Sequence, residues 1–235
     1  MKKVCIMQPT YLPWPGYFGL MMISDLFILL DNVQFKKRGW QQRNKIKTST
    51  GEIWLTVPVI SKNNFNQKIN EVKLLDSKKF KTNHLKSLKV NYSKSQYYNK
   101  YINEIEEIYN KEHKKLVEIN IDFINWIKEK LKIKTQTIKS SNLTSSGKKD
   151  ILLANLVNEV GYKKYIYNEG SENYIFKSDE FKKNDIDLVK FKFNITKYNQ
   201  LFGKFIPYMS VLDLMFNCGE ESKNIIFQAS SFEEK

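Results

Sequence analysis

Two arginines, Arg38 and Arg43, lie five positions apart in the block from Asp31 to Asn44, whereas every other basic residue of this chain is a lysine. The planar guanidinium group binds a carboxylate or a phosphate through two parallel hydrogen bonds, a geometry that an ammonium group cannot reproduce. Together with Lys37, which precedes Arg38, the arginines predict a site that holds a diphosphate or a carboxylate.

Amide and aromatic side chains occur in and just before this block. Three amides are predicted to orient a polar substrate: Gln8, Gln34 and Asn44. Three aromatic residues are predicted to form a stacking wall for a base or a sugar: Trp14, Tyr17 and Trp40. For each aromatic residue, a place in the hydrophobic core is an equally good interpretation.

Other candidates lie further along the chain. Ser140 and Ser141 open the Ser-rich loop 140–147, whose backbone amides are suited to binding phosphate ahead of the helix predicted at 148–160. Asp213 follows Ser210 at the capping-box spacing, so a helix cap or a salt bridge is its competing interpretation. His84 stands alone in a helical pattern, where a structural histidine is the alternative to a functional one.

The elements that must position these residues begin with an apolar run at Val4–Met7, followed by a loop rich in proline and glycine that includes Gly16. An apolar helix to Ile23 and a strand at 26–30 come next. Ligands of open α/β sheets bind beyond the carboxyl ends of parallel strands, which is where Gln8 and Asp31 would lie. The alternative is that the loop is only a tight turn and that Asp31 caps it.

Downstream, Glu52–Ile60 predicts a strand whose end is weakened by Pro58, and residues 77–131 have the period of amphipathic helices. Strands at 135–139, 165–170 and 186–193 then alternate with helices, whereas residues 230–235 are expected to fray. The alternation predicts an α/β fold with a mostly parallel sheet. We expect a single domain over 1–235, with 77–131 as a helical insertion.

The chain has a net charge of +14, which is compatible with nucleic-acid binding, but its lysines are spread over nearly the whole length. Aromatic residues interleave with lysines between Tyr92 and Tyr101, so RNA binding remains an alternative. No apolar stretch is long enough for a transmembrane segment and no leader pattern opens the chain, so we expect a cytoplasmic protein. Two cysteines and two histidines, without metal-ligand spacing, predict no metal site.

Several motifs together resemble the WbqC-like family of bacteria over residues 3–220. The motifs are Gln8-Pro9 with Pro13, Gly16 and Tyr17; Asp31 to Arg38 with Trp40, Arg43 and Asn44; Trp54 to Pro58; His84; Tyr92; Ser140-Ser141; and Ser210 to Gly219. The family is associated with gene clusters for O-antigen and other surface polysaccharides, and the resemblance implies a transferase, with glycine transfer as the suggested activity.

The N-terminal region also resembles pantothenate synthetase and the nucleotidylyl-transferase superfamily. Pro9-Thr10, Trp14 to Tyr17 and Asn32 to Phe35 occur in the same order as motifs of that enzyme. The two histidines of its His-x-Gly-His motif, which stabilise phosphates during adenylation, are replaced here by Trp14 and Tyr17. The resemblance therefore implies a Rossmann-like, nucleotidylyl-transferase-like fold and argues against adenylate chemistry.

These resemblances imply an enzyme that transfers an aminoacyl group, such as glycyl, to an amino sugar carried by a nucleotide or a lipid. Such a reaction needs a base, for which Asp31 and His84 are the candidates, and donors for the developing oxyanion. ATP or an aminoacyl donor, including an aminoacyl-tRNA, is the implied co-reactant. The alternatives are a nucleotide-sugar-binding module without catalytic activity and a tRNA-binding protein.

Overall fold

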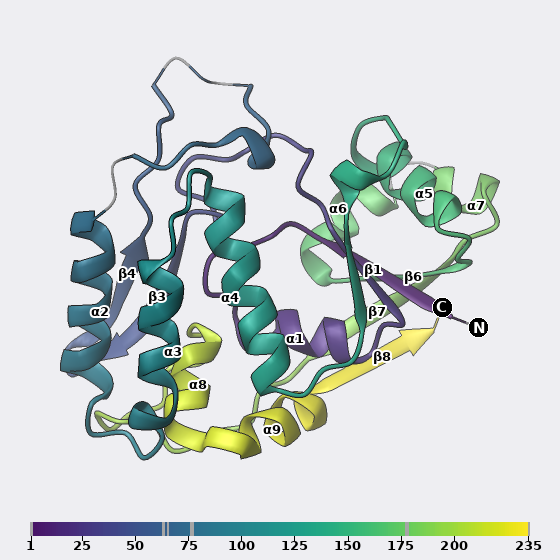
Figure 1. Ribbon diagram of the computed structural model, residues 1–235. Helices are drawn as coiled ribbons and strands as arrows, with labels where there is room; N and C mark the ends of the chain where they lie inside the picture. Colours follow the sequence, from purple (N-terminus) through teal and green to yellow (C-terminus); the bar gives the residue numbers. More distant parts are fainter. Residues whose placement is uncertain (1, 63, 65, 76–77, 177–178, 235) are drawn as a thin grey trace.

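The computed structural model describes residues 2–62, 64, 66–75, 78–176 and 179–234. Its main sheet has six strands: β1 (Lys3–Met7), β2 (Leu26–Leu29), β5 (Gln136–Lys139), β6 (Lys164–Tyr167), β7 (Asp187–Phe193) and β8 (Ser230–Glu234). Their order is β5-β2-β1-β6-β7-β8, and all neighbours are parallel except the antiparallel pair β7 and β8 (Figure 1). If the five parallel strands are numbered along the chain, their order across the sheet is 3-2-1-4-5. This is a doubly wound, Rossmann-like topology, and the strand order reverses between β1 and β6.

The central strands form because their residues are apolar on both faces. Every residue of β2 is buried, as are Val4, Cys5 and Ile6 of β1. One face of the sheet packs on α1 (Pro15–Met22), α4 (Leu116–Lys130) and α9 (Ser222–Ala229), and the opposite face packs on α5 (Lys149–Glu159) and α7 (Glu180–Lys183). The expected α/β class with a mostly parallel sheet is confirmed.

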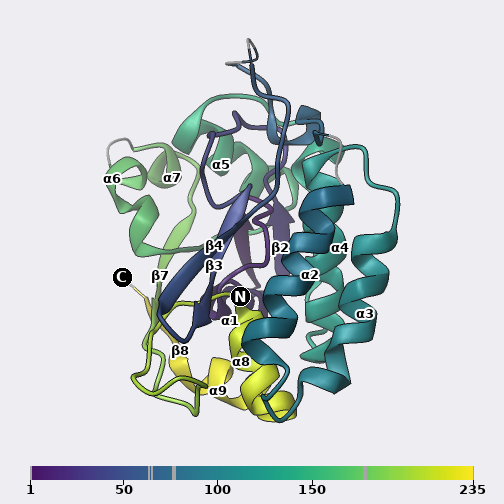
Figure 2. The ribbon, with the colours of Figure 1, turned by 90° about the vertical axis from the view of Figure 1, so that its left-hand side faces the viewer.

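A long insertion separates β2 from β5. It contains an antiparallel hairpin, β3 (Arg43–Thr48) and β4 (Gly51–Thr56), followed by α2 (Lys78–Tyr92), α3 (Tyr98–Asn110) and α4. Figure 2 shows the hairpin beside the three helices. The expected helices are present in the described part of 77–131. The strand expected at Glu52–Ile60 stops before Pro58 and pairs with β3, a partner that the sequence did not reveal.

The C-terminal region continues through α8 (Val211–Cys218) to α9 and β8. Ser210 caps α8, because its hydroxyl accepts a hydrogen bond from the backbone N–H of Leu212 at 3.3 Å, and Gly219 ends the helix at φ +55°. The expectation that residues 230–235 fray is wrong for 230–234, which form β8 and cover the edge of β7; residue 235 lies outside the described residues.

Short elements complete the chain. They are the 3₁₀ turns η1 (Ile69–Glu71), η2 (Ser140–Asn142), η3 (Glu169–Ser171) and η4 (Gly219–Glu221), and the single-turn helix α6 (Glu172–Ile175). Within the described ranges, every helix is too short or too polar to cross a membrane. Those ranges also contain no group of three His, Cys, Asp or Glu side chains arranged to hold a metal ion.

Candidate functional site

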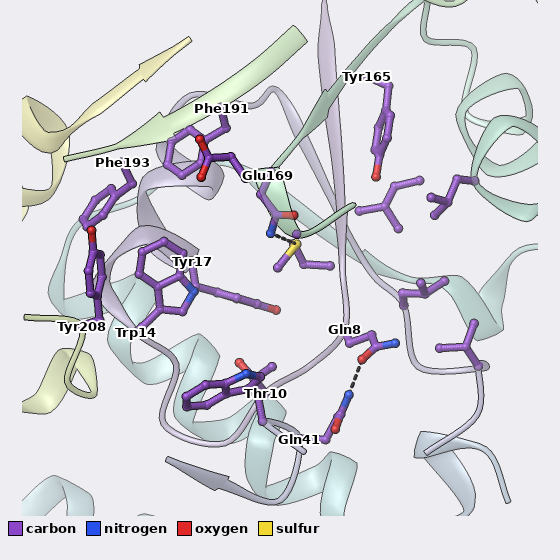
Figure 3. A pocket seen from close by; sticks show the side chains of 18 of the residues that line it. Gln8, Thr10, Trp14, Tyr17, Gln41, Tyr165, Glu169, Phe191, Phe193 and Tyr208 are labelled. Carbon is purple, nitrogen blue, oxygen red and sulfur yellow. Dashed lines mark hydrogen bonds between the residues drawn. The ribbon is translucent and has the colours of Figure 1, made fainter. Parts of the chain in front are cut away.

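A cleft of about 1420 Å³ opens at the carboxyl ends of β1, β6 and β7, beside the first turn of α5 (Figure 3). This is the switch point of the sheet, where open α/β proteins bind ligands. Its lining is Ile6, Met7, Gln8, Thr10, Trp14, Tyr17, Leu30, Val33, Gln34, Trp40, Gln41, Asn44, Lys149, Leu152, Leu153, Tyr165, Asn168, Glu169, Gly170, Phe191, Lys192, Phe193, Asn194 and Tyr208. The cleft therefore contains six of the residues predicted to bind substrate.

An aromatic wall forms one side of the cleft. The ring of Trp14 packs edge-on against Phe193 at 5.0 Å and against Tyr208 at 5.9 Å between centroids. Tyr208 is 50% exposed, so part of this wall remains open to a ligand. Stacking surfaces of this kind bind the flat face of a base or the C–H face of a sugar ring.

Trp14 can take its position only because residue 16 is glycine. A Cβ atom placed on Gly16 would lie 2.1 Å from Cη2 of the indole, far inside the contact distance. Gly16 and Trp14 belong to the tightly turned start of α1, where Pro15 occupies the first helical position. Gly16 thus contributes to the cleft through the position of Trp14.

We expect Gly16→Ala to weaken ligand binding about tenfold while leaving thermal stability nearly unchanged. The indole must move away from the new methyl group and alter the wall, whereas alanine is itself favoured over glycine in a helix by about 1 kcal/mol. Calorimetric titration and thermal unfolding of the variant check the two effects. Gly170→Ala also adds a methyl group to the cleft lining but leaves Trp14 in place, because a Cβ there meets only Asn168 Oδ1 at 3.6 Å, so it separates the effect of the moved indole from that of an added methyl group.

Amide side chains organise the loop after β1. Gln41 donates from Nε2 to Gln8 Oε1 across the cleft. Asn120 of α4 donates to the carbonyls of Pro9 at 3.1 Å and Gln41 at 2.8 Å, which ties the two loops together. Asn44 donates to the Leu12 carbonyl at 2.7 Å. The amides predicted to orient a substrate therefore also hold the cleft in shape.

Charged residues enter the cleft from three later elements. Lys149 is the first residue of α5, Glu169 opens η3 and Lys192 belongs to β7. Glu169 also lies 3.7 Å from Lys190, and Lys192 pairs with Glu233. Of the described residues along the cleft, Glu169 carries the only carboxylate. The strand and sharp turn predicted at 165–170 were one sign of Glu169, whereas Lys149 and Tyr208 had no recognisable motif.

Asp31 lies outside the cleft lining, buried beyond the end of β2. Its carboxylate accepts hydrogen bonds from the Ser140 hydroxyl at 3.0 Å, from the Ser141 backbone N–H at 2.9 Å and from the Ser141 hydroxyl at 2.8 Å. The structure therefore brings Asp31 together with Ser140 and Ser141 at the carboxyl edge, a contact that was not predicted from the sequence. Their contacts join the ends of β2 and β5.

His84 also lies away from the cleft, buried in α2 among aromatic side chains. Its Nδ1 is 2.8 Å from the Tyr11 hydroxyl, which in turn contacts the Tyr109 hydroxyl. Burial lowers the pKa of His84 to about 4, so the imidazole is neutral near pH 7. These contacts are those of a structural histidine.

The arginine block is split by the structure. Lys37 and Arg38 are exposed outside the cleft, and Arg38 has φ +59°. The Arg43 guanidinium instead stacks on the Trp54 ring at 4.1 Å, and Trp54 packs against Trp40 at the cleft rim. The two guanidinium groups therefore have separate surroundings.

Asp213 lies in the first turn of α8 and is completely buried. Its carboxylate accepts hydrogen bonds from the hydroxyls of Tyr92 at 2.8 Å and Tyr198 at 2.7 Å and from Gln200 Nε2 at 2.7 Å. Burial raises the pKa of Asp213 although these donors favour its ionised form. Tyr92, together with Tyr98 and Tyr101, is buried, so these three rings offer no exposed stacking surface for RNA.

Fold and cleft together define a Rossmann-like α/β protein with a ligand cleft at its topological switch point. The sequence matches the WbqC-like protein family over residues 8–225, and the chain belongs to this family, which confirms the resemblance seen in its motifs. The chain is similar to the uncharacterised protein Rv1507c of Mycobacterium tuberculosis, with 36% identity over 230 residues, 96% of this chain and 98% of the relative. No solved structure matches the chain.

Proposed function

We propose that this protein is a transferase of surface-polysaccharide synthesis that joins an aminoacyl group, such as glycyl, to the amine of a nucleotide- or lipid-linked amino sugar. The observation that carries the proposal is the cleft at the switch point, which combines an aromatic wall with amides, two lysines and one carboxylate. The surface-polysaccharide setting comes from the family resemblance.

The size and chemistry of the cleft support a compound ligand. Its volume of about 1420 Å³ exceeds the 300–1,000 Å³ that is usual for small-molecule sites, so a sugar with its carrier group is a better match than a free sugar. Trp14 and Tyr208 are suited to a base or sugar ring, and Lys149 and Lys192 to a diphosphate. ATP or an activated aminoacyl ester would enter as co-substrate.

In the proposed reaction, the amine nitrogen of the sugar attacks the carbonyl carbon of an activated aminoacyl ester. A carbon–nitrogen bond forms, the bond from the carbonyl carbon to the ester oxygen breaks, and that oxygen leaves with the electron pair. Glu169 accepts the proton lost by the amine, because it is the carboxylate that faces the cleft. Asp31 and His84 lie elsewhere, so the base role moves from them to Glu169.

We expect Glu169→Gln to lower the rate of aminoacyl transfer at least 100-fold while the amino sugar still binds. Mass spectrometry of a UDP-amino sugar incubated with an aminoacyl donor measures the transfer. Glu172→Gln is the matched control, because Glu172 pairs with the same Lys190 at 2.8 Å but lies outside the cleft. Equal loss of rate in both variants, or no loss in either, would contradict the role of Glu169.

Thermal shift tests ligand binding before any turnover assay. A ligand present at about 100 times its dissociation constant should stabilise the protein by about 2.7 kcal/mol. Absence of a shift with both nucleotide-linked and lipid-linked amino sugars would defeat the proposed substrate class.

A nucleotide-sugar-binding module without catalytic activity is the second candidate. It is favoured by the placement of Trp14 and Tyr17, which line the cleft where the nucleotidylyl-transferase motif carries histidines. Tight binding of a nucleotide sugar without acyl transfer from any activated donor would select this function over the first.

A further inference from the structure

Three buried polar atoms lie along the floor of the cleft. Within the described chain, the hydroxyls of Tyr17 and Thr10 and the Oε1 atom of Gln41 are buried and have no hydrogen-bond partner. Tyr17 is 0% exposed and Gln41 is 7% exposed. Buried polar groups are almost always paired, so three unpaired atoms lining one cleft indicate positions that a ligand satisfies.

The orientation of each group is fixed by its surroundings. Gln41 uses Nε2 to donate to Gln8, which leaves Oε1 as the free acceptor. The Gln41 backbone is held in turn by Asn120. The Tyr17 ring is wedged between Phe18 and Phe27, at 5.6 and 5.1 Å between centroids, and its hydroxyl points into the cleft (Figure 3). The floor therefore presents a phenol hydroxyl and an amide oxygen in preset positions.

The charge of the floor limits what it can bind. Tyr17, Thr10 and Gln41 carry no formal charge, and burial raises the pKa of Tyr17 well above its ordinary value, so its hydroxyl remains a donor. The charged residues of the cleft, Lys149, Glu169 and Lys192, come from other elements. A phosphate or carboxylate on the floor would lose its hydration without gaining a counter-charge, which is strongly unfavourable.

We propose that this floor is a subsite for a neutral amide, with the Tyr17 hydroxyl donating to the carbonyl oxygen and Gln41 Oε1 accepting from the N–H. An amide presents one acceptor beside one donor, which complements this pair of groups. The proposal rests on the function proposed above and deepens it, because an amide on the sugar is the product of that reaction. It places the amide on the floor and leaves the lysines for the diphosphate.

The first test compares Tyr17→Phe with Tyr167→Phe. Both substitutions remove only a buried hydroxyl that has no partner within the described chain, but Tyr167 lies outside the cleft. Binding of UDP-N-acetylglucosamine, measured by calorimetry, should weaken about tenfold in Tyr17→Phe and stay within twofold of the parent in Tyr167→Phe. Unchanged binding in Tyr17→Phe, or equal loss in both variants, would overturn the subsite.

A second test does not depend on the nucleotide. Crystals of the parent are soaked separately in acetamide and in acetate, which share a shape and differ in charge. Acetamide on the floor, in contact with Tyr17 and Gln41, and its absence from Tyr17→Phe crystals would support the subsite. Acetate on the floor, or no acetamide there, would overturn it. If UDP-N-acetylglucosamine fails to bind the parent while acetamide occupies the floor, the nucleotide-linked form of the proposed function fails and the amide subsite stands.

Discussion

Replacing Asp213 with alanine is expected to lower the free energy of unfolding by about 3–5 kcal/mol, the effect of removing one partner from a buried charged network. The Tyr92 and Tyr198 hydroxyls and the Gln200 amide all donate to this carboxylate, and alanine offers none of them an acceptor. Denaturant unfolding measures the loss. Tyr198→Phe, which removes one donor and leaves the carboxylate, should cost only about 1 kcal/mol.

The substitution should also disturb the cleft from a distance. Gln200 bonds both the N–H and the carbonyl of Ile206 and so anchors the loop that ends in Tyr208. Without Asp213, we expect faster amide hydrogen exchange in residues 198–208 than in the rest of the variant. Stability within about 1 kcal/mol of the parent, with unchanged exchange in this loop, would contradict the structural role of Asp213.

Asp31→Ala is expected to lower the free energy of unfolding by about 3 kcal/mol, because it leaves the backbone N–H and the hydroxyl of Ser141 without their acceptor. It also removes one of the two acceptors of the Ser140 hydroxyl, which keeps Asn32 Oδ1 at 2.8 Å. The substitution should loosen two loops at once, because the Asp31 carboxylate links the end of β2 to the end of β5. Thermal and denaturant unfolding measure it. Asp25→Ala, at the opposite end of β2 and exposed, should cost at most about 1 kcal/mol.

The two roles considered for Asp31 give different results. A structural tie predicts that stability and ligand binding fall together and that both are partly restored by Asp31→Asn, which keeps one acceptor oxygen. A catalytic base predicts that transfer is abolished in both variants while the unfolding midpoint remains that of the parent. The second pattern would return the base role from Glu169 to Asp31.

Local signals in the sequence were sufficient for the parallel strands and for the position of the cleft. Continuous apolar runs marked β1 and β2, and the rule that ligands bind at carboxyl ends placed Gln8 at the cleft. Trp14 and Tyr17 follow from the same loop. These features depend on neighbouring residues, which is why composition and spacing revealed them.

Features that depend on contacts between residues distant in sequence could not be predicted from such local signals. Strand β3 begins at Arg43 and is rich in lysine and polar residues, so its pairing with β4 decides its structure more than its own propensity does. The polar segment 230–234 becomes a strand because β7 offers an open edge. One face of the Arg43 guanidinium stacks on the Trp54 ring, a contact that no local pattern indicated, whereas the anion binding predicted for Arg43 stays a prediction.

The cleft residues that were not predicted from the sequence escaped prediction for the same reason. Lys149, Glu169 and Tyr208 come from three segments that meet only when the sheet has formed. No spacing in the chain relates them to Gln8, and each is of a type common on protein surfaces. Knowing the strand order would have identified Glu169, because it follows β6 at the switch point, whereas Tyr208 depends on the course of a long irregular loop.

The strand order also governs when the sheet can be completed during synthesis. β1 is made first and lies in the middle of the sheet, yet its neighbour β6 begins only at Lys164. β2 must likewise wait for β5, which follows the whole insertion. The unpaired edges of two strands with apolar side chains therefore emerge from the ribosome long before their partner strands, and pairings so distant in sequence form slowly. Until residue 164 has been made, the growing chain exposes this apolar surface except where the insertion helices cover one face of it.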